Sequence, residues 1–340
     1  MGVRSPLAQF KTGSGVTIYR LPLQSFPNHF TNCYLVLAGK QVILIDAASG
    51  WDSANRDLLD CFEQLRDRFG ETVTLADVDT LLITHGHIDH FGGIHFVKSH
   101  APQVRIGIHE LDARIIEHID ERIILAGKNL EIYLERAGLS ARSVANLSQM
   151  NKWSKGRFAP CPVDFLLEPQ AEQPLLGLFE VFHAPGHCPG QVCLKLDDVL
   201  FSADHVLARI TPVQSPEAIT RYTGLGHYLT ALGEIKQLSG VRLVLGGHEQ
   251  EVEDLAGRVD EMIVFHQGRL EKALDACQES QTIKAISGLL FPNVSGYNIL
   301  LALLETGAHI EYLYQRGHLS ITNLDEVERE RNPAIYYRRV

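Results

Sequence analysis

The feature that most constrains this chain is the stretch at residues 84–90, T-H-G-H-I-D-H, in which three histidines and an aspartate fall within six residues. It follows an apolar run at residues 81–83, which predicts a buried strand, and precedes a predicted helix. Gly86 allows a sharp turn at the strand end, and Gly92 and Gly93 allow close backbone approach. Imidazole and carboxylate groups are the usual ligands of zinc and similar divalent metals. The stretch therefore predicts a metal-binding loop between a strand and a helix.

Three further ligand candidates also follow predicted strands. They are His187 in A-P-G-H-C-P-G-Q (residues 184–191), Asp204 in F-S-A-D-H (residues 201–205) and His248 in G-G-H (residues 246–248). Loops at strand ends are where a rigid scaffold usually presents reactive groups. We therefore expect these side chains to join the first motif at one site.

The candidates form two sets that together suit two metal ions. One set is His85, His87 and His187, and the other is Asp89, His90 and His248, with Asp204 placed to bridge them. Two divalent ions about 3.5–4 Å apart would use all seven residues and lower the pKa of a shared water, which gives a hydroxide nucleophile. Asp89 and Asp204 are the predicted catalytic carboxylates, and no serine or cysteine nucleophile is required.

Four other residues are candidates for supporting or substrate-binding roles, each with an alternative. Asp46 ends a predicted strand, where it either supports a metal site or forms a turn. His205 either supports the site or packs in the core. Arg209 either binds an anionic substrate group or forms a surface salt bridge. Tyr222 is a candidate pocket residue.

The chain outside the motifs predicts an α/β catalytic domain, a helical insertion and a small C-terminal domain. Strands are expected within residues 16–46 and a helix at 53–69, closed by Gly70. Residues 110–154 are helical by periodicity and form either a lid over the metal site or an ordinary crossover helix pair. Helices at 281–291, 297–304 and 305–315, followed by a hairpin, predict a winged-helix-like domain. The expected domains are therefore residues 1–275 and 276–340.

Composition narrows the partners and the compartment. The formal net charge of -10 argues against general binding to nucleic acid or anionic membranes. Six cysteines without a C-x-x-C pair are typical of reduced thiols in a cytoplasmic protein. The first residues contain no secretory signal, and no apolar run approaches the length of a membrane span. We expect a small-molecule substrate, with a homodimer left open.

The order of these motifs resembles the metallo-β-lactamase superfamily over about residues 15–275. The resemblance implies an αβ/βα sandwich with the metals at one edge and the seven residues named above as ligands, supported by Asp46. Two departures stand out: Ala203 replaces the usual glycine before the bridging aspartate, and residues 110–154 lengthen the chain between His90 and His187. The C-terminal tail, with residues 204–212, is similar to the subgroup that contains lactamase-like protein 2.

The resemblance leaves several activities open, because one fold supports many reactions. The leading hypothesis is a hydrolase with two divalent ions, zinc first and iron or manganese as alternatives, acting on a thioester or lactone. A phosphodiesterase or ribonuclease is the second hypothesis, although residues 278–340 carry six basic and seven acidic side chains, a poor balance for phosphate contacts. An iron-dependent oxidoreductase on the same fold is the third.

Overall fold

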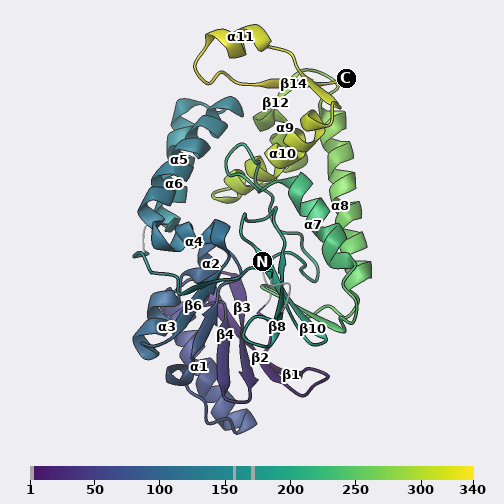
Figure 1. Cartoon of the computed structure of the whole chain (residues 1–340). Helices are drawn as coiled ribbons and strands as arrows, with labels where there is room; N and C mark the ends of the chain where they lie inside the picture. Colours follow the sequence, from purple (N-terminus) through teal and green to yellow (C-terminus); the bar gives the residue numbers. More distant parts are fainter. Residues whose placement is uncertain (1–3, 156–157, 170–172) are drawn as a thin grey trace. The chain divides into compact units, whose positions relative to one another are not determined.

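The computed structural model describes residues 4–155, 158–169 and 173–340, and its elements are labelled in Figure 1. Contacts divide the chain into two compact units. The first comprises residues 1–119, 159–212 and 231–259, and the second comprises residues 120–158, 213–230 and 260–340. The domain boundary expected near residue 275, and the two domains it defines, stay a prediction.

The first unit contains two sheets. The seven-stranded sheet runs in chain order: β1 (Ala8–Lys11), β2 (Thr17–Phe26), β3 (His29–Ala38), β4 (Gln41–Ile45), β5 (Thr80–Leu82), β6 (Arg105–Ile108) and β7 (Phe165–Leu166). The four-stranded sheet has the order β11 (Leu243–Gly246), β10 (Val199–Ala203), β9 (Val192–Leu196) and β8 (Phe179–His183). Pairing is antiparallel from β1 to β4 and parallel from β4 to β7, so β4 and β5 end at the same edge.

The core of the first unit lies between these sheets. Alternate residues of both sheets form one buried cluster, for example Val36 and Ile43 from the first and Leu194 and Phe201 from the second. Alternation is expected where one face of each strand is buried, and two such faces make a sandwich. The predicted αβ/βα sandwich is therefore confirmed.

Four helices of the first unit connect these strands: α1 (Asp52–Phe69), α2 (Ile88–Phe91), α3 (Ile94–His100) and α4 (Glu110–Glu117), with a short 3₁₀ helix at Leu75–Asp77. In α1, Leu58, Phe62 and Leu65 are buried at helical spacing, and α1 packs against β2. Gly70 ends α1 in a left-handed conformation with φ 72, which confirms its predicted role.

The second unit is mainly helical. It contains most of α5 (Ile119–Arg136), then α6 (Ala141–Lys155), α9 (Ile283–Leu290), α10 (Asn298–Gln315) and α11 (Leu324–Arg329), while α7 (Leu225–Lys236) and α8 (Leu255–Ala276) contribute residues to both units. A small antiparallel sheet has the order β12 (Gln281–Thr282), β14 (Tyr336–Arg339) and β13 (Leu319–Ile321). A second hydrophobic core, including Leu134, Ile286 and Leu303, joins these helices.

Two sequence-based expectations for the second unit can be compared with this fold. The helical character of residues 110–154 is confirmed by α4, α5 and α6, but their role as a lid stays a prediction. The predicted break between helices at residue 305 is wrong, because α10 runs without interruption through Glu305. The side chain of Glu305 is buried, and its carboxylate forms an ion pair with Arg269. The winged-helix-like assignment stays a prediction.

Two further expectations concern the whole chain. All six cysteines are buried thiols, and none of them forms a disulfide. Within the described residues, no helix combines the length and the hydrophobicity that a membrane span requires.

Candidate metal centre

The first histidine loop lies between β5 and α2, as its sequence indicates. His85 and His90 are fully buried, whereas His87 is partly exposed and precedes α2 as its N-cap. A Cβ on Gly92 would lie 2.3 Å from the carbonyl oxygen of Ser49, so close backbone approach at this glycine is confirmed. The chain bends at His85 and Gly86, so the predicted turn after β5 is confirmed. Gly86 makes this bend without a left-handed backbone, and it also has a packing role described below.

The other ligand candidates arrive from three further strand ends. His187 follows β8, Asp204 follows β10, and His248 follows β11. The end of β10 contains a register shift, and Ala203 adopts φ 47 there. This left-handed backbone is one that glycine adopts without cost, which explains why glycine is usual before the bridging aspartate and why alanine is strained there. The bulge directs the side chain of Asp204 away from the ladder.

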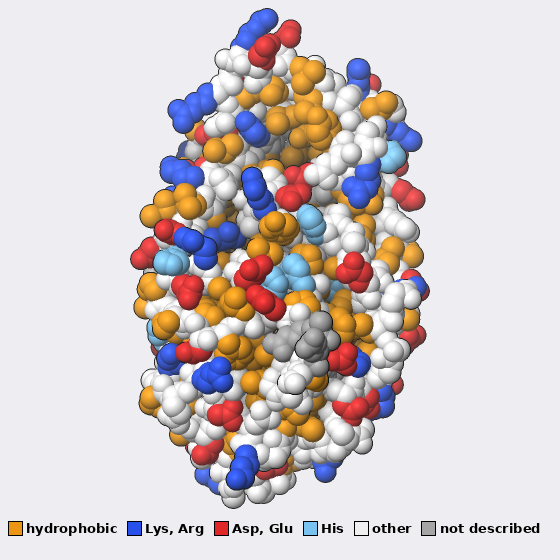
Figure 2. Space-filling view, viewed as in Figure 1, with side chains coloured by type: hydrophobic (Ala, Val, Ile, Leu, Met, Phe, Trp, Pro, Cys, Tyr) orange, Lys and Arg blue, Asp and Glu red, His pale blue; other side chains and the backbone are white. Residues whose placement is uncertain are grey.

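The structure brings all seven predicted ligands together in overlapping groups. The ligand atoms within each group lie within 4.8 Å of one another, and the groups are His85, His87 and His187; His85, His90 and Asp204; and His29, Asp89 and His248. Asp204 lies between the sets, because its Oδ2 is 3.5 Å from Nε2 of His187 and 3.2 Å from Nε2 of His248. Figure 2 shows histidine side chains gathered on one face beside acidic side chains.

The residues present suit divalent metal ions. The donors are all imidazole nitrogens and carboxylate oxygens, the set that zinc, iron and manganese accept in proteins. Nε2 of His90 and Oδ1 of Asp204 are buried 3.4 Å apart, yet neither makes a hydrogen bond of good geometry to any described residue. Buried polar atoms are rarely left in this state, and a bound cation would satisfy both.

Charges within the cluster shift the pKa values of its members in opposite directions. Burial, together with the nearby His187, lowers the pKa of His87 to about 3, so this imidazole is neutral and ready to bind a metal. Burial opposes protonation of His248 as well, but the charge and hydrogen bond of Asp204, together with the charge of Asp89, outweigh it and raise that pKa to about 9. Burial would raise the pKa of Asp204, but His248 and His90 hold it well below its usual value. In the metal-free protein, the set formed by Asp89, His90 and His248 therefore holds a proton on histidine at the place where a metal ion would bind.

Asp46 supports this loop from behind. Its carboxylate accepts hydrogen bonds from the backbone nitrogen and the hydroxyl of Thr84, and its Oδ2 lies 2.8 Å from Nδ1 of His90. A metal-binding histidine usually donates a hydrogen bond from its other ring N–H to such a carboxylate, which fixes the ring and its tautomer. Asp46 itself has φ 61, a conformation that aspartate tolerates better than most residues.

One residue at the cluster was missed by the sequence analysis. His29, the first residue of β3, places Nε2 2.7 Å from Oδ2 of Asp89, and its ring centre lies 4.7 Å from that of His248. It follows the left-handed Asn28 (φ 59) in the β2–β3 turn. Because it lies far from the other motifs in sequence and carries no ligand spacing of its own, only the pairing of these strands reveals it.

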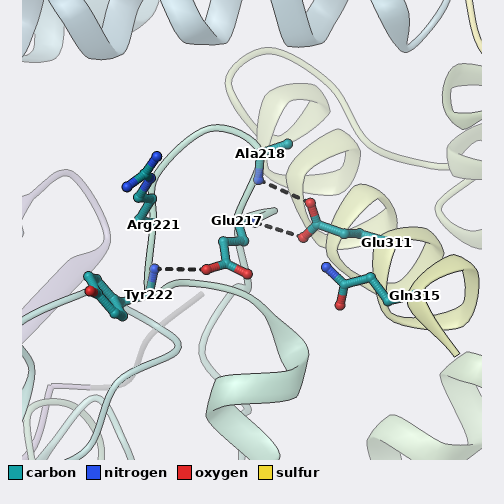
Figure 3. Close-up of a pocket in the computed structure, with 6 residues that line it drawn as sticks. All are labelled: Glu217, Ala218, Arg221, Tyr222, Glu311 and Gln315. Atoms are coloured by element: carbon teal, nitrogen blue, oxygen red, sulfur yellow. Dashed lines mark hydrogen bonds between the residues drawn. The ribbon is translucent and has the colours of Figure 1, made fainter.

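The remaining candidates are placed less centrally. His205 is fully buried, and burial lowers its pKa to about 3. Arg209 is exposed and forms an ion pair of 3.3 Å with Glu249, as expected of a surface salt bridge. Tyr222 belongs to the second unit, where it lines an open pocket of about 490 Å³ with Arg221 and Glu311 (Figure 3). Substrate contacts by these residues stay proposals.

The fold and the site together define a class, that of αβ/βα sandwich proteins with histidine and aspartate ligands at the strand ends. The family model of the metallo-beta-lactamase superfamily matches residues 27–248, and the chain belongs to this superfamily.

Relatives of known sequence support this membership. Lactamase-like protein aptB of Emericella nidulans is 24% identical over 258 residues, which make up 74% of this chain and 61% of aptB. The beta-lactamase-like protein 2 homolog of Drosophila melanogaster is 24% identical over 249 residues, covering 72% of this chain and 66% of that protein. The matched part of the chain therefore spans less than two thirds of the length of these curated relatives.

Solved structures extend the similarity to nearly the whole chain. A metallo-beta-lactamase family protein from Thermus thermophilus is 26% identical with a TM-score of 0.76, over 95% of this chain and 98% of that one. A beta-lactamase domain protein from Burkholderia ambifaria is 22% identical with a TM-score of 0.75, over 99% and 96% of the two chains, and shows the fold alone.

Proposed function

We propose that this protein is a hydrolase that binds two divalent metal ions, with zinc favoured, and acts on a small ester-like substrate such as a thioester or lactone. One observation carries the proposal: Asp204 contacts both sets of ligands. Its carboxylate lies 3.5 Å from Nε2 of His187 on one side, and 3.4 Å and 3.2 Å from His90 and His248 on the other. A single carboxylate in this position can serve two ions at once.

The chemistry follows from this arrangement. Two bound divalent ions would lower the pKa of a water between them and polarise a substrate carbonyl. Asp204 or a second bound water would take up the proton released from that water and pass it to the leaving group. Asp89 would fix the second ion, and the hydrogen bond from His29 to Asp89 would keep its carboxylate turned towards His248.

The exposed side of the cluster indicates where a substrate enters within the first unit. His29, His87 and Asp89 are partly exposed, whereas His85 and His90 are fully buried. Arg209, the sequence candidate for anion binding, is already paired with Glu249. An uncharged ester-like group at this entrance is therefore favoured over a phosphodiester.

Metal analysis combined with a substrate screen tests the proposal. The purified protein should contain close to two divalent ions per chain and hydrolyse at least one thioester or lactone in a panel that also includes phosphodiesters and β-lactams. His87→Ala should lose both the activity and one ion. His100→Ala, a change at an exposed histidine of α3, is the matched control and should retain both.

Each alternative has its own outcome in this experiment. Full hydrolysis by a metal-free preparation would contradict a metal mechanism. Selective cleavage of phosphodiesters, with salt-sensitive binding of single-stranded RNA, would favour the nuclease alternative. Iron as the native metal, together with oxygen consumption and no hydrolysis, would favour the oxidoreductase.

A further inference from the structure

We propose that Asp112 is a positioning residue that holds the two histidine loops of the first metal position at a fixed separation. The inference rests on the proposed metal-binding role of His85, His87 and His187. Asp112 lies on α4 and is fully buried. It matches none of the metal-site motifs in the sequence and provides no ligand atom to the groups described above.

One carboxylate of Asp112 bridges both loops. Its Oδ2 accepts a hydrogen bond of 2.7 Å from the backbone nitrogen of Gly86, which lies between His85 and His87. Its Oδ1 accepts a hydrogen bond of 3.0 Å from the backbone nitrogen of Gly190, three residues after His187. Hydrogen bonds from backbone N–H groups to an ionised carboxylate are stronger than neutral ones. Each histidine loop is therefore tied to the same side chain.

The two glycines fit closely against this carboxylate. A Cβ on Gly190 would lie 2.7 Å from Cγ of Asp112, and a Cβ on Gly86 would lie 3.2 Å from Cγ of Asp112 and 2.4 Å from Cδ1 of Ile115. A side chain at position 190 would therefore displace the carboxylate or the loop. Close contact with α4 explains why both positions lack a Cβ. The two glycines lie in separate sequence motifs but pack against the same helix.

A carboxylate suits this position better than any other small side chain. It offers one acceptor oxygen to each of the two backbone N–H groups, whereas asparagine would place its NH2 donor against one of them. A third donor, the thiol of Cys188, lies 3.2 Å from Oδ2. The same loop is also packed from the start of α4, where the ring of His109 stacks on His183 with centres 4.2 Å apart.

The consequence concerns metal affinity. If the loops are held at the separation required by an ion, little ordering remains to be done on binding, and affinity is high. Loss of the bridge should leave His85, His87 and His187 present but free to move apart. Supporting groups of metal ligands usually contribute 10–100-fold to affinity.

The test compares Asp112→Ala and Asp112→Asn with a matched control, Asp79→Asn. Asp79 also accepts a backbone hydrogen bond, 2.7 Å from Val42, but it precedes β5 at the end of the strand opposite His85. Affinity for Zn²⁺ is measured by competition with a chelator, and the ligand field by the visible spectrum of Co²⁺-substituted protein. Amide hydrogen exchange at Gly86 and Gly190 is measured in the metal-free state.

We expect Asp112→Ala to lower the affinity for the ion held by His85, His87 and His187 by roughly 10–100-fold and to change the Co²⁺ spectrum. Exchange at Gly86 and Gly190 should accelerate roughly tenfold. Asp112→Asn should retain protection at one glycine and show a smaller loss of affinity. Asp79→Asn should lower thermal stability without changing affinity or either amide.

The outcomes separate this inference from the proposed function. Unchanged affinity and unchanged exchange in folded Asp112→Asn would overturn the role of Asp112 while leaving the metal site intact. Failure of the parent protein to bind any divalent ion would overturn both proposals. If Asp112→Ala does not fold, the asparagine variant and its exchange pattern still decide the question.

Discussion

Among the residues that the structure describes, one cluster of histidines and carboxylates lies in each unit, and the two clusters differ in the charges around their carboxylates. The first is the seven-residue cluster around Asp204. The second consists of His266, Glu305 and His309, all buried, whose ligand atoms also lie within 4.8 Å of one another. Residue types and proximity are alike, so the difference must lie in the other charges around each carboxylate.

In the second cluster a cation is already present. The guanidinium of Arg269 pairs with Oε1 of Glu305, and the backbone nitrogen of Gln214 donates to Oε2 at 2.7 Å. Nδ1 of His309 lies 2.7 Å from the carbonyl oxygen of Glu305, and its Nε2 lies 3.2 Å from Nδ1 of His266. The carboxylate thus has its counter-charge and its hydrogen bonds, and a metal ion would meet a fixed positive charge.

The first cluster lacks such a partner. Among the described residues, Asp89 and Asp204 form ion pairs with histidines only, and no lysine or arginine contacts them. In the metal-free protein the counter-charge of these carboxylates is a proton on a histidine, as the raised pKa of His248 indicates, and a divalent ion can take the place of that proton. This difference is the reason we propose a metal site at the first cluster and a structural network at the second.

The largest expected contrast comes from removing one carboxylate charge in each cluster. Asp204→Asn should reduce hydrolysis by on the order of 10²–10⁴-fold, as expected for loss of a group that transfers protons, and should release metal. Glu305→Gln should leave metal content and activity near the parent values but reduce the free energy of unfolding by on the order of 3 kcal/mol, because Arg269 loses its partner. Activity assays, metal analysis and urea unfolding measure the three effects.

Two outcomes of these substitutions would contradict the proposed difference between the clusters. A loss of bound metal in Glu305→Gln would show that the second cluster also binds an ion. Normal metal content and activity in Asp204→Asn would remove the bridging role on which the proposed function rests.

The sequence predicted the first cluster well because its ligands carry local signals. The motif at residues 84–90 has the spacing of metal ligands. The other three candidates, His187, Asp204 and His248, each follow an apolar strand. His29 and Asp112 carry no such signal, because each acts across a fold contact: His29 through the pairing of β2 and β3, and Asp112 through the packing of α4 on two loops. Long-range contacts of this kind are set by tertiary structure.

The fold was predictable to a similar degree and for a similar reason. Short runs of apolar and β-branched residues indicated the strands of the sandwich, and the helical period of the apolar residues in α1 indicated its buried face. The predicted break at Glu305 was wrong because a charged residue within an apolar stretch resembles a helix start. Its burial is made acceptable by the ion pair with Arg269, which lies on α8, and by the hydrogen bond from the backbone nitrogen of Gln214.

Metal addition provides the second contrast, now between ligand and structural residues. Metal-free parent protein should gain about 4 kcal/mol of unfolding free energy when the free ion concentration is 1,000 times the dissociation constant. His187→Ala should lose much of this increase in unfolding free energy. His309→Gln should be less stable than the parent without metal but should show the same increase when metal is added. Thermal or urea unfolding with and without Zn²⁺ provides the measurement. The prediction would be contradicted if the parent bound a third ion that the His309→Gln variant did not bind.

A third substitution asks whether Arg269 is what excludes metal from the second cluster. Arg269→Met should reduce the free energy of unfolding by about 2–3 kcal/mol, since Glu305 is left buried without its cation. Zn²⁺ should restore part of that loss, because His266, Glu305 and His309 then offer a three-ligand set without an opposing charge. The measurement is unfolding in urea across a Zn²⁺ titration, read against the parent. Absence of any extra zinc effect would show that geometry, rather than charge, excludes the ion.

The smallest expected effect, at most about 1.4 kcal/mol for each pH unit, concerns the acid sensitivity of the second cluster. Burial, with contributions from His309 and Arg269, lowers the pKa of His266 from 6.5 to about 3. As the pH falls below about 6.5, the unfolded chain binds a proton that the folded chain refuses, so stability is complete above that pH and is lost towards pH 3, by at most about 1.4 kcal/mol per pH unit. In metal-free protein, His266→Gln and His266→Phe should both show a shallower fall in unfolding free energy between pH 6.5 and 4. If neither variant changes the slope, His266 titrates alike in both states, and the second cluster is less shielded from protons than its contacts indicate.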